Sequence, residues 1–169
     1  MGDGSRVAVV TGGASGIGEG IVRRHVADGG RCVVADLQFE RAEALAAELG
    51  DRVVALRVDV TAEADVAAAV DLAVSHFGRL DCMFNNAGML GAVGSIVDHT
   101  LEAWQRTLDV LLTSVFIGIR EAGRVMVPQG SGAIVNTAST AGVRGGLGPH
   151  AYTAAKHAVV GLTESAAVE

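Results

Sequence analysis

The sequence predicts an α/β protein built on a doubly wound parallel sheet of five strands, with helices on both faces. Three observations support this prediction: short apolar runs without polar alternation, helical periodicity between them, and a glycine-rich turn directly after the first run. Continuous apolar runs are typical of parallel strands that are covered on both faces. Strands that alternate with helices imply right-handed crossovers within one sheet.

The expected strands are the apolar runs 7–10, 32–35, 53–56, 80–84 and 133–135. Between them, residues 39–49 and 66–77 place apolar side chains on one helical face, and further helices are expected over residues 100–127 and 152–169. Thr61 and Thr100 stand where helix N-caps belong, whereas Gly29, Gly30 and Gly50 stand where helices should end. Pro128 and Pro149 are expected in loops.

Composition narrows the possible functions. The 169 residues carry a net charge of -6 and no run of Lys or Arg, so nucleic acids and anionic membranes are not expected partners. The apolar stretches are too short to span a bilayer and the N-terminus lacks the features of a secretory signal, which favours a cytoplasmic protein. Residues 1–169 read as one domain, and because residues 158–169 resemble the middle of a helix, we expect it to be incomplete at the C-terminus.

Neither cysteines nor histidines form a metal motif. Cys32 and Cys82 lie in apolar runs and are interpreted as free, buried thiols. The five histidines form no metal-binding pair, so we expect no metal and place them on solvated surfaces. His150 is the exception, because it lies two residues before a candidate catalytic tyrosine and could contact a substrate.

A glycine-rich segment, residues 11–18 (Thr-Gly-Gly-Ala-Ser-Gly-Ile-Gly), joins the first strand to a helix that begins near Gly16. Backbone N–H groups and the positive end of a helix dipole suit a pyrophosphate. The alternative of an NTP-binding P-loop fails, since Glu19 and Gly20 occupy the positions that require Lys and then Ser or Thr. The residues expected to bind the cofactor here are Gly12, Ser15, Gly16, Ile17 and Gly18.

Asp36 ends the second strand, eighteen residues after Gly18. A carboxylate at this position can accept hydrogen bonds from the ribose hydroxyls of a dinucleotide, which indicates a Rossmann-type domain. The same charge would repel a 2'-phosphate, and the glycine loop contains no Arg or Lys. The sequence therefore predicts NAD rather than NADP as cofactor.

Tyr152 is the only tyrosine and precedes Lys156 by four residues on an expected helix, which places phenol and ammonium on one face. A nearby cation stabilises a phenolate and lowers its pKa, so this pair could move a proton. Ser139 ends the fifth strand, at the edge of the sheet where α/β proteins bind ligands, and could hold a substrate oxygen. Asn86, Ala87 and Gly88 follow the fourth strand at the same edge.

Over its whole length, the sequence resembles the short-chain dehydrogenase/reductase family. Residues 11–18 look like its cofactor loop, Asp59 and Val60 like its adenine-side pair, and residues 85–88 like its NNAG element, while Ser139, Tyr152 and Lys156 match its catalytic residues in order and spacing. The resemblance implies NAD(P)-dependent oxidation of an alcohol or reduction of a carbonyl, on a small-molecule substrate. Tyr152 would exchange the proton, and Ser139 would orient the substrate oxygen. Tyr152 and Lys156 would both bind the cofactor, with Lys156 holding the nicotinamide ribose. A homodimer or homotetramer is also implied.

Two departures from the family pattern keep alternatives open. Leu111 stands where the family has an asparagine that supports a proton relay to the lysine, and the family's chain continues with two more strands and a closing segment. A catalytically silent NAD-binding protein or fragment is therefore the main rival, and we expect a 169-residue polypeptide to bind NAD weakly and turn over little. An epimerase or dehydratase is weaker, because that branch usually carries TGxxGxxG.

Overall fold

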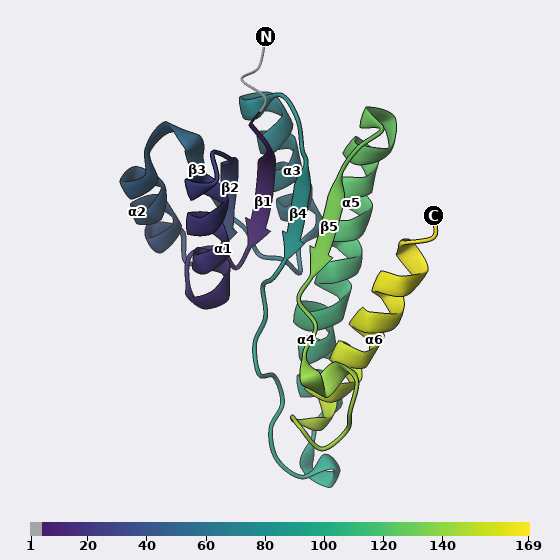
Figure 1. Cartoon of the computed structure of the whole chain (residues 1–169). Coiled ribbons are helices and arrows are strands. Elements are labelled where there is room, and N and C mark those ends of the chain that lie inside the picture. Colours follow the sequence, from purple (N-terminus) through teal and green to yellow (C-terminus); the bar gives the residue numbers. More distant parts are fainter. Residues whose placement is uncertain (1–4) are drawn as a thin grey trace.

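A computed structural model describes residues 5–169 and confirms the doubly wound parallel sheet (Figure 1). Its strands are β1 (Val7–Thr11), β2 (Arg31–Asp36), β3 (Val53–Arg57), β4 (Cys82–Asn85) and β5 (Ala133–Asn136). They lie in the order β3-β2-β1-β4-β5, and every neighbouring pair is parallel. All five expected strands are present, with small shifts at their ends.

Six α-helices accompany the sheet in the described residues: α1 (Gly16–Ala27), α2 (Phe39–Leu49), α3 (Glu63–Phe77), α4 (Leu101–Leu108), α5 (Ser114–Gln129) and α6 (His150–Ala166). Apolar residues of α1 and α2 pack on one face of the sheet, and those of α3 and α5 pack on the other. Both layers therefore bury the central strands, as the continuous apolar runs predict.

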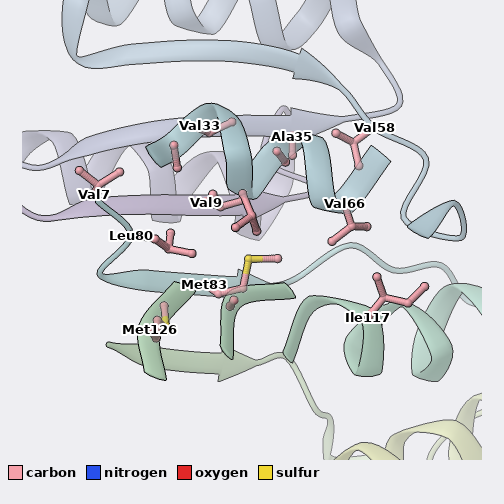
Figure 2. Packing of buried hydrophobic residues seen from close by; sticks show 14 residues of the cluster. Val7, Val9, Val33, Ala35, Val58, Val66, Leu80, Met83, Ile117 and Met126 are labelled. Carbon is pink, nitrogen blue, oxygen red and sulfur yellow. The ribbon is translucent and has the colours of Figure 1, made fainter. Parts of the chain in front are cut away.

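Burial is complete along the central strands β1 and β2, where residues 7–10 and 32–35 are wholly inaccessible to solvent. Figure 2 shows the core on the α3 and α5 side, where Val9 of β1 and Met83 of β4 meet Val66 of α3 and Ile117 of α5. The edge strand β5 departs from the expectation that both faces are covered, because Val135 is 46% exposed. Cys32 is buried as expected, whereas Cys82 is only partly buried.

Thr100 is the N-cap of α4, as predicted, and its hydroxyl accepts a hydrogen bond from the Ala103 N–H at 3.1 Å. The prediction for Thr61 is wrong, since the N-cap of α3 is Ala62. The Thr61 hydroxyl instead donates to a carboxylate oxygen of Asp59 at 2.7 Å. A threonine hydroxyl that hydrogen-bonds a nearby aspartate is no longer available to cap the helix.

The expected helix over residues 100–127 is interrupted. Between α4 and α5 the chain forms a π-helical turn, Asp109–Thr113. Pro128, expected in a loop, lies inside the last turn of α5, and the helix ends at Gly130 with a φ of 70°. Proline cannot donate the backbone hydrogen bond of its turn, and α5 continues for only one residue beyond Pro128, so the expected loop begins two residues later than predicted. Helix α6 begins at His150, two residues before the expected start, and ends at Ala166.

The order of the strands reverses at β1, which lies between β2 and β4. Ligands of open α/β sheets bind in the crevice outside the carboxyl ends of the strands at such a point. The glycine-rich loop follows β1 and the Asn86 to Gly88 segment follows β4, so both reach this crevice. Among residues 5–169, no helix combines the length and apolar character needed to cross a membrane.

Helix α5 approaches β4 through Gly118, where an added Cβ would overlap the side-chain amide of Asn85. That amide donates to Asn136 of β5 at 2.8 Å, so it is not free to move. Overpacking of this kind typically costs ~1–3 kcal/mol. We therefore predict that Gly118→Ala lowers the free energy of unfolding by this amount, measured by urea denaturation followed by circular dichroism.

Gly123 of the same helix is the matched control, because an added Cβ there meets no atom within 4 Å. Gly123→Ala should raise the free energy of unfolding by roughly 0.5–1 kcal/mol through helix propensity alone. Equal effects of the two alanines would contradict the close packing of α5 on β4.

Candidate functional site

The carboxyl ends of β1 and β4 are tied together by the buried hydroxyl of Thr11. This hydroxyl donates to the Phe84 carbonyl at 3.2 Å and accepts from the N–H groups of Asn86 at 3.0 Å and Ala87 at 3.1 Å. In return, the Asn86 side chain donates to the carbonyls of Thr11 at 3.1 Å and Gly12 at 3.3 Å. The loop after β1 and the turn after β4 therefore form one rigid floor.

Two glycines allow this close approach. Gly12 has a φ of 62°, and a Cβ there would lie 2.8 Å from the Ala87 Cα. At Gly18 a Cβ would overlap the Gly12 carbonyl oxygen and lie 2.7 Å from the Asn86 side-chain nitrogen. Gly18 therefore serves the packing of α1 against the loop, and it does not line the cavity described next. Direct contact of Gly18 with a cofactor remains a prediction.

A cavity of about 620 Å³ opens above this floor, at the carboxyl ends of the strands. It brings together most of the residues predicted to form the site: Gly12, Ser15, Gly16, Ile17, Asp36, Asp59, Val60, Asn86, Ala87, Gly88, Tyr152 and Lys156. Sequence reasoning missed several further lining residues: Leu37, Gln38, Val58, Met89, Leu90, Arg106, Val110 and Thr137. Arg106 and Val110 are four residues apart in the sequence, a spacing that places them on one helical face and could have indicated that both line the cavity.

Asp36 is held at one end of the cavity and is 7% exposed. One carboxylate oxygen accepts from the Ala14 N–H of the glycine loop at 2.9 Å, and the other accepts from the Gln38 N–H at 2.9 Å. Each carboxylate oxygen has a second lone pair, so both can still accept from a ligand. The loop therefore orients the acid that the sequence places eighteen residues beyond it.

Asp59 lies on the same side of the cavity. Hydrogen bonds from the hydroxyl of Thr61 at 2.7 Å and from its N–H at 2.9 Å lower the pKa of the Asp59 carboxyl below its usual value. The positive charge of Arg106 lowers this pKa further. Asp59 therefore carries a negative charge at neutral pH, and Arg106, which also lines the cavity, is close enough for the two charges to attract.

Tyr152 and Lys156 lie in the first two turns of α6. The Lys156 ammonium is 5.7 Å from the centre of the Tyr152 ring and donates to the Thr137 carbonyl at 2.6 Å. The lysine is only 4% exposed, and this burial lowers its pKa below 10.5. They are the only lysine and the only tyrosine in the sequence. The site thus brings a phenol and a partly desolvated ammonium together in the cavity that Asp36 also lines.

Ser139 follows β5 and begins a 3-10 turn, Thr140–Gly142, where its hydroxyl oxygen accepts from the Ala141 N–H at 3.1 Å. This turn packs against α6, because a Cβ at Gly142 would lie 2.7 Å from the Lys156 carbonyl oxygen. Ser139 is not among the residues that line the cavity. The structure therefore places it on a segment in contact with the Lys156 turn, and its catalytic role remains a prediction.

Leu111 occupies the π-helical turn between α4 and α5 and lines the cavity, where it is almost fully buried. A Cβ at Gly88 would lie 3.3 Å from its Cδ2 atom. The position that carries an asparagine in the resembled family is therefore filled by a hydrocarbon that cannot hydrogen-bond. Lys156 has the backbone carbonyl of Thr137 as a polar partner instead.

The expectation that all histidines lie on solvated surfaces is wrong for His99. Both of its ring nitrogens are buried without a hydrogen-bond partner in the described part of the chain, and its ring stands 5.9 Å from that of His150. The contact joins the segment before α4 to the start of α6, two residues before Tyr152. Local sequence could not show this, because the two histidines are distant along the chain.

The lowered pKa of Lys156 can be measured directly, because a single lysine gives a single side-chain NMR signal. We predict that this signal titrates below 10.5 in the folded protein and near 10.4 in urea. Since the unfolded state then binds more protons between the two pKa values, stability relative to Lys156→Met should increase as pH rises through that interval. Titration of the folded protein at or above the urea value would contradict the desolvation of this ammonium.

Comparison with known proteins agrees with this geometry. A model of the short chain dehydrogenase family matches residues 6–169. The chain is 51% identical over 169 residues to "Sex determination protein tasselseed-2" of Zea mays, an alignment that covers 97% of this chain and 50% of that protein. It is 48% identical over 164 residues to a 3-alpha-(or 20-beta)-hydroxysteroid dehydrogenase of Mycobacterium tuberculosis (strain H37Rv), covering 97% of this chain and 63% of the relative.

The crystal structure of a short chain dehydrogenase/reductase from Burkholderia phymatum in complex with NAD has the same fold, with a TM-score of 0.90 at 36% identity. The match covers 95% of this chain and 58% of that one. The chain thus spans between 50% and 63% of the length of these three proteins. On the family match and these identities, the chain belongs to the short-chain dehydrogenase family.

Proposed function

We propose that the protein is an NAD-dependent oxidoreductase that interconverts a secondary alcohol and a ketone. The observation that carries this proposal is that the glycine loop, Asp36, Tyr152 and Lys156 line one cavity. The names of two similar proteins, a hydroxysteroid dehydrogenase and a short chain dehydrogenase/reductase in complex with NAD, are in keeping with it. Because the chain spans only part of these proteins, the activity is proposed for the whole protein to which it corresponds.

The residues present fit a dinucleotide. A cavity of about 620 Å³ is within the usual range for cofactor sites, and a floor in which Gly12 and Gly18 leave no room for side chains suits a pyrophosphate. We assign the adenosine end to Asp36 and Asp59, whose carboxylates can accept from ribose and adenine, and the nicotinamide end to Tyr152 and Lys156. NAD bound in this way supplies the hydride acceptor.

The residues at the nicotinamide end would handle the proton. Tyr152 exchanges a proton with the substrate oxygen, and the Lys156 ammonium, 5.7 Å from its ring, favours the phenolate. Ser139 is suited to orient the same oxygen. Its own oxygen is already an acceptor for the Ala141 N–H, which leaves the hydroxyl proton available to donate to a substrate.

A catalytically silent NAD-binding protein is the second candidate, and Leu111 is the observation that favours it. An apolar side chain beside Gly88 removes a polar anchor from the cavity wall near Lys156. Proton exchange with solvent would then depend on the Thr137 carbonyl and on water. The two candidates share the cofactor site and differ in turnover alone.

We further propose that the protein forms a homodimer or homotetramer through the helices of residues 100–127 and 152–169, which correspond to α4, α5 and α6. Phe116 and Val127 of α5 are large apolar side chains that stay exposed in the single chain, at 48% and 80%. Exposed apolar positions on one helix are typical of an interface between copies.

NADH is expected to bind roughly a hundredfold more tightly than NADPH, because Asp36 meets ribose hydroxyls in the first and a phosphate dianion in the second. Asp36→Ala should narrow this ratio. Asp51→Ala, which removes an exposed acid outside the cavity, should leave it unchanged. A fluorescence titration gives both dissociation constants, and equal values for NADH and NADPH in the unaltered protein would refute the role of Asp36.

Tyr152→Phe is expected to lower turnover ~100- to 10,000-fold, the usual contribution of general acid–base catalysis, while NADH affinity changes little. The change removes only the hydroxyl and keeps the ring next to Lys156. NADH formation from a panel of secondary alcohols measures the effect. Retention of activity within a few-fold would remove Tyr152 from the mechanism. If the whole protein binds NADH yet turns over no alcohol of the panel, the silent candidate is supported instead.

A further inference from the structure

Helix α6 carries both Tyr152 and Lys156, yet only its first half packs into the protein. Its buried residues are Ala151, Ala155, Lys156 and Val159, and none of residues 160–166 is buried. Beside the second half lies a cavity of about 890 Å³, which is bounded by residues of α5, β5 and α6. Figure 1 shows the end of α6 diverging from β5. Apolar packing alone therefore does not fix the direction of this helix.

A hydrogen bond connects β5 to the second half of α6 at the wall of this cavity. The side-chain amide of Asn136, the last residue of β5, donates to the Thr163 hydroxyl at 3.0 Å. This hydroxyl in turn donates to the Val159 carbonyl, one turn earlier in α6, at 2.6 Å. Because its proton is used within the helix, the Thr163 oxygen is the acceptor that α6 presents to β5.

Asn136 is itself held by Asn85. The two residues form the last pair in the register of β4 and β5, and the Asn85 amide donates to the Asn136 side-chain oxygen at 2.8 Å. Asn85 is 4% exposed, and helix α5 packs so closely on it that a Cβ at Gly118 would overlap its amide. Since the Asn136 oxygen is occupied by Asn85, its nitrogen is the group that faces Thr163.

Lys156 makes a second attachment of α6 to the same strand end. Its ammonium donates to the carbonyl of Thr137, the residue that follows β5, at 2.6 Å. The Thr137 N–H donates in turn to the Asn85 carbonyl at 3.0 Å. Both attachments of α6 therefore lead back to Asn85, one through its side chain and the other through its backbone.

The spacing of the two attachments restrains the helix in both of the ways in which it could move. Lys156 and Thr163 are seven residues apart, so they lie on one face, about two turns or ~10 Å along the axis. A single attachment would leave α6 free to swing about that point. Two attachments on one face restrain both its rotation and its translation along the end of β5.

We propose that Asn136 and Thr163 are positioning residues for the proposed reaction. Their hydrogen bond fixes α6 on the end of β5, and so keeps the Lys156 ammonium beside the Tyr152 ring. The inference rests on the proposed function, which gives those two side chains their roles. Neither Asn136 nor Thr163 lines the cavity that contains Tyr152, so both act through the helix.

Three variants of α6 isolate the hydroxyl. Thr163→Val removes it and keeps a β-branched side chain, whereas Thr163→Ser keeps it. Ser165→Ala removes an exposed hydroxyl from the same helix and is the control for loss of a hydroxyl as such. If Thr163→Val does not fold, Thr163→Ala makes the same comparison, since alanine favours the helix and also lacks the hydroxyl.

The first readout is the position of Lys156 relative to Tyr152, and it requires no turnover. Because each residue type occurs once, protein that carries protons only in lysine and tyrosine side chains gives assigned nuclear Overhauser effects between the two. Thr163→Val should weaken these cross-peaks and move the Lys156 titration upward, toward its value in urea, as the ammonium becomes hydrated. Thr163→Ser and Ser165→Ala should leave both unchanged.

The second readout is turnover of the whole protein with the panel of secondary alcohols. Small displacements of reacting groups typically cost up to ~100-fold, so Thr163→Val should lower kcat by roughly 10- to 100-fold. Its NADH affinity should change little, because Asp36 and the glycine loop are untouched. If Asn136 acts through Thr163, adding Thr163→Val to Asn136→Leu should lower kcat no further than Asn136→Leu alone.

The outcomes separate the inference from the function on which it rests. If the unaltered whole protein turns over no alcohol, the proposed function fails and the inference falls with it. If that protein is active and Thr163→Val lowers only the free energy of unfolding, with kcat and both NMR signals unchanged, the hydrogen bond is merely structural and the inference is overturned. Equal effects of Thr163→Ser and Thr163→Val would also overturn it, because the shape of the side chain rather than its hydroxyl would then be responsible.

Discussion

The site depends on one buried hydroxyl. Thr11, only 3% exposed, connects the end of β1 to the turn after β4 by three hydrogen bonds, and Asn86 returns two more to the glycine loop. Loss of such a group leaves buried donors unpaired, at a typical cost of ~1–3 kcal/mol each. Gly12 packs against Ala87 and Gly18 against Asn86 in the same turn, so the shape of the cavity floor depends on Thr11.

The charged side chains that line the cavity are not evenly distributed: the carboxylates of Asp36 and Asp59 and the ammonium of Lys156 come from different strands and helices. Asp36 and Asp59 come at the ends of β2 and β3, on one side of the sheet, and the charge of Arg106 acts on Asp59. Lys156 bonds the residue that follows β5, on the other side of the sheet, beside Tyr152. Leu111 makes the wall near Lys156 less polar than an asparagine would.

The strands, the glycine loop and Asp36 could be predicted from the sequence because each depends on local pattern: apolar runs, glycines before a helix, an acid at a strand end. Other features could not be predicted, for one of two reasons. Some depend on contacts between segments that are distant in the sequence, and others on neighbouring residues that compete for the same hydrogen bond. Thr61 bonds Asp59 instead of capping α3, the ring nitrogens of His99 are buried where its ring contacts that of His150, and Gly18 packs against Asn86. Arg106 was missed because its partner Asp59 lies on a different element.

The central claim is that this cavity orients a dinucleotide with its nicotinamide beside Tyr152. Because the chain has one tyrosine, protein in which only that ring carries protons allows nuclear Overhauser effects from Tyr152 to bound NADH to be assigned without ambiguity. The account predicts cross-peaks from the Tyr152 ring to the nicotinamide protons and none to adenine. Cross-peaks to adenine, or saturable NADH binding with no contact to Tyr152, would contradict it.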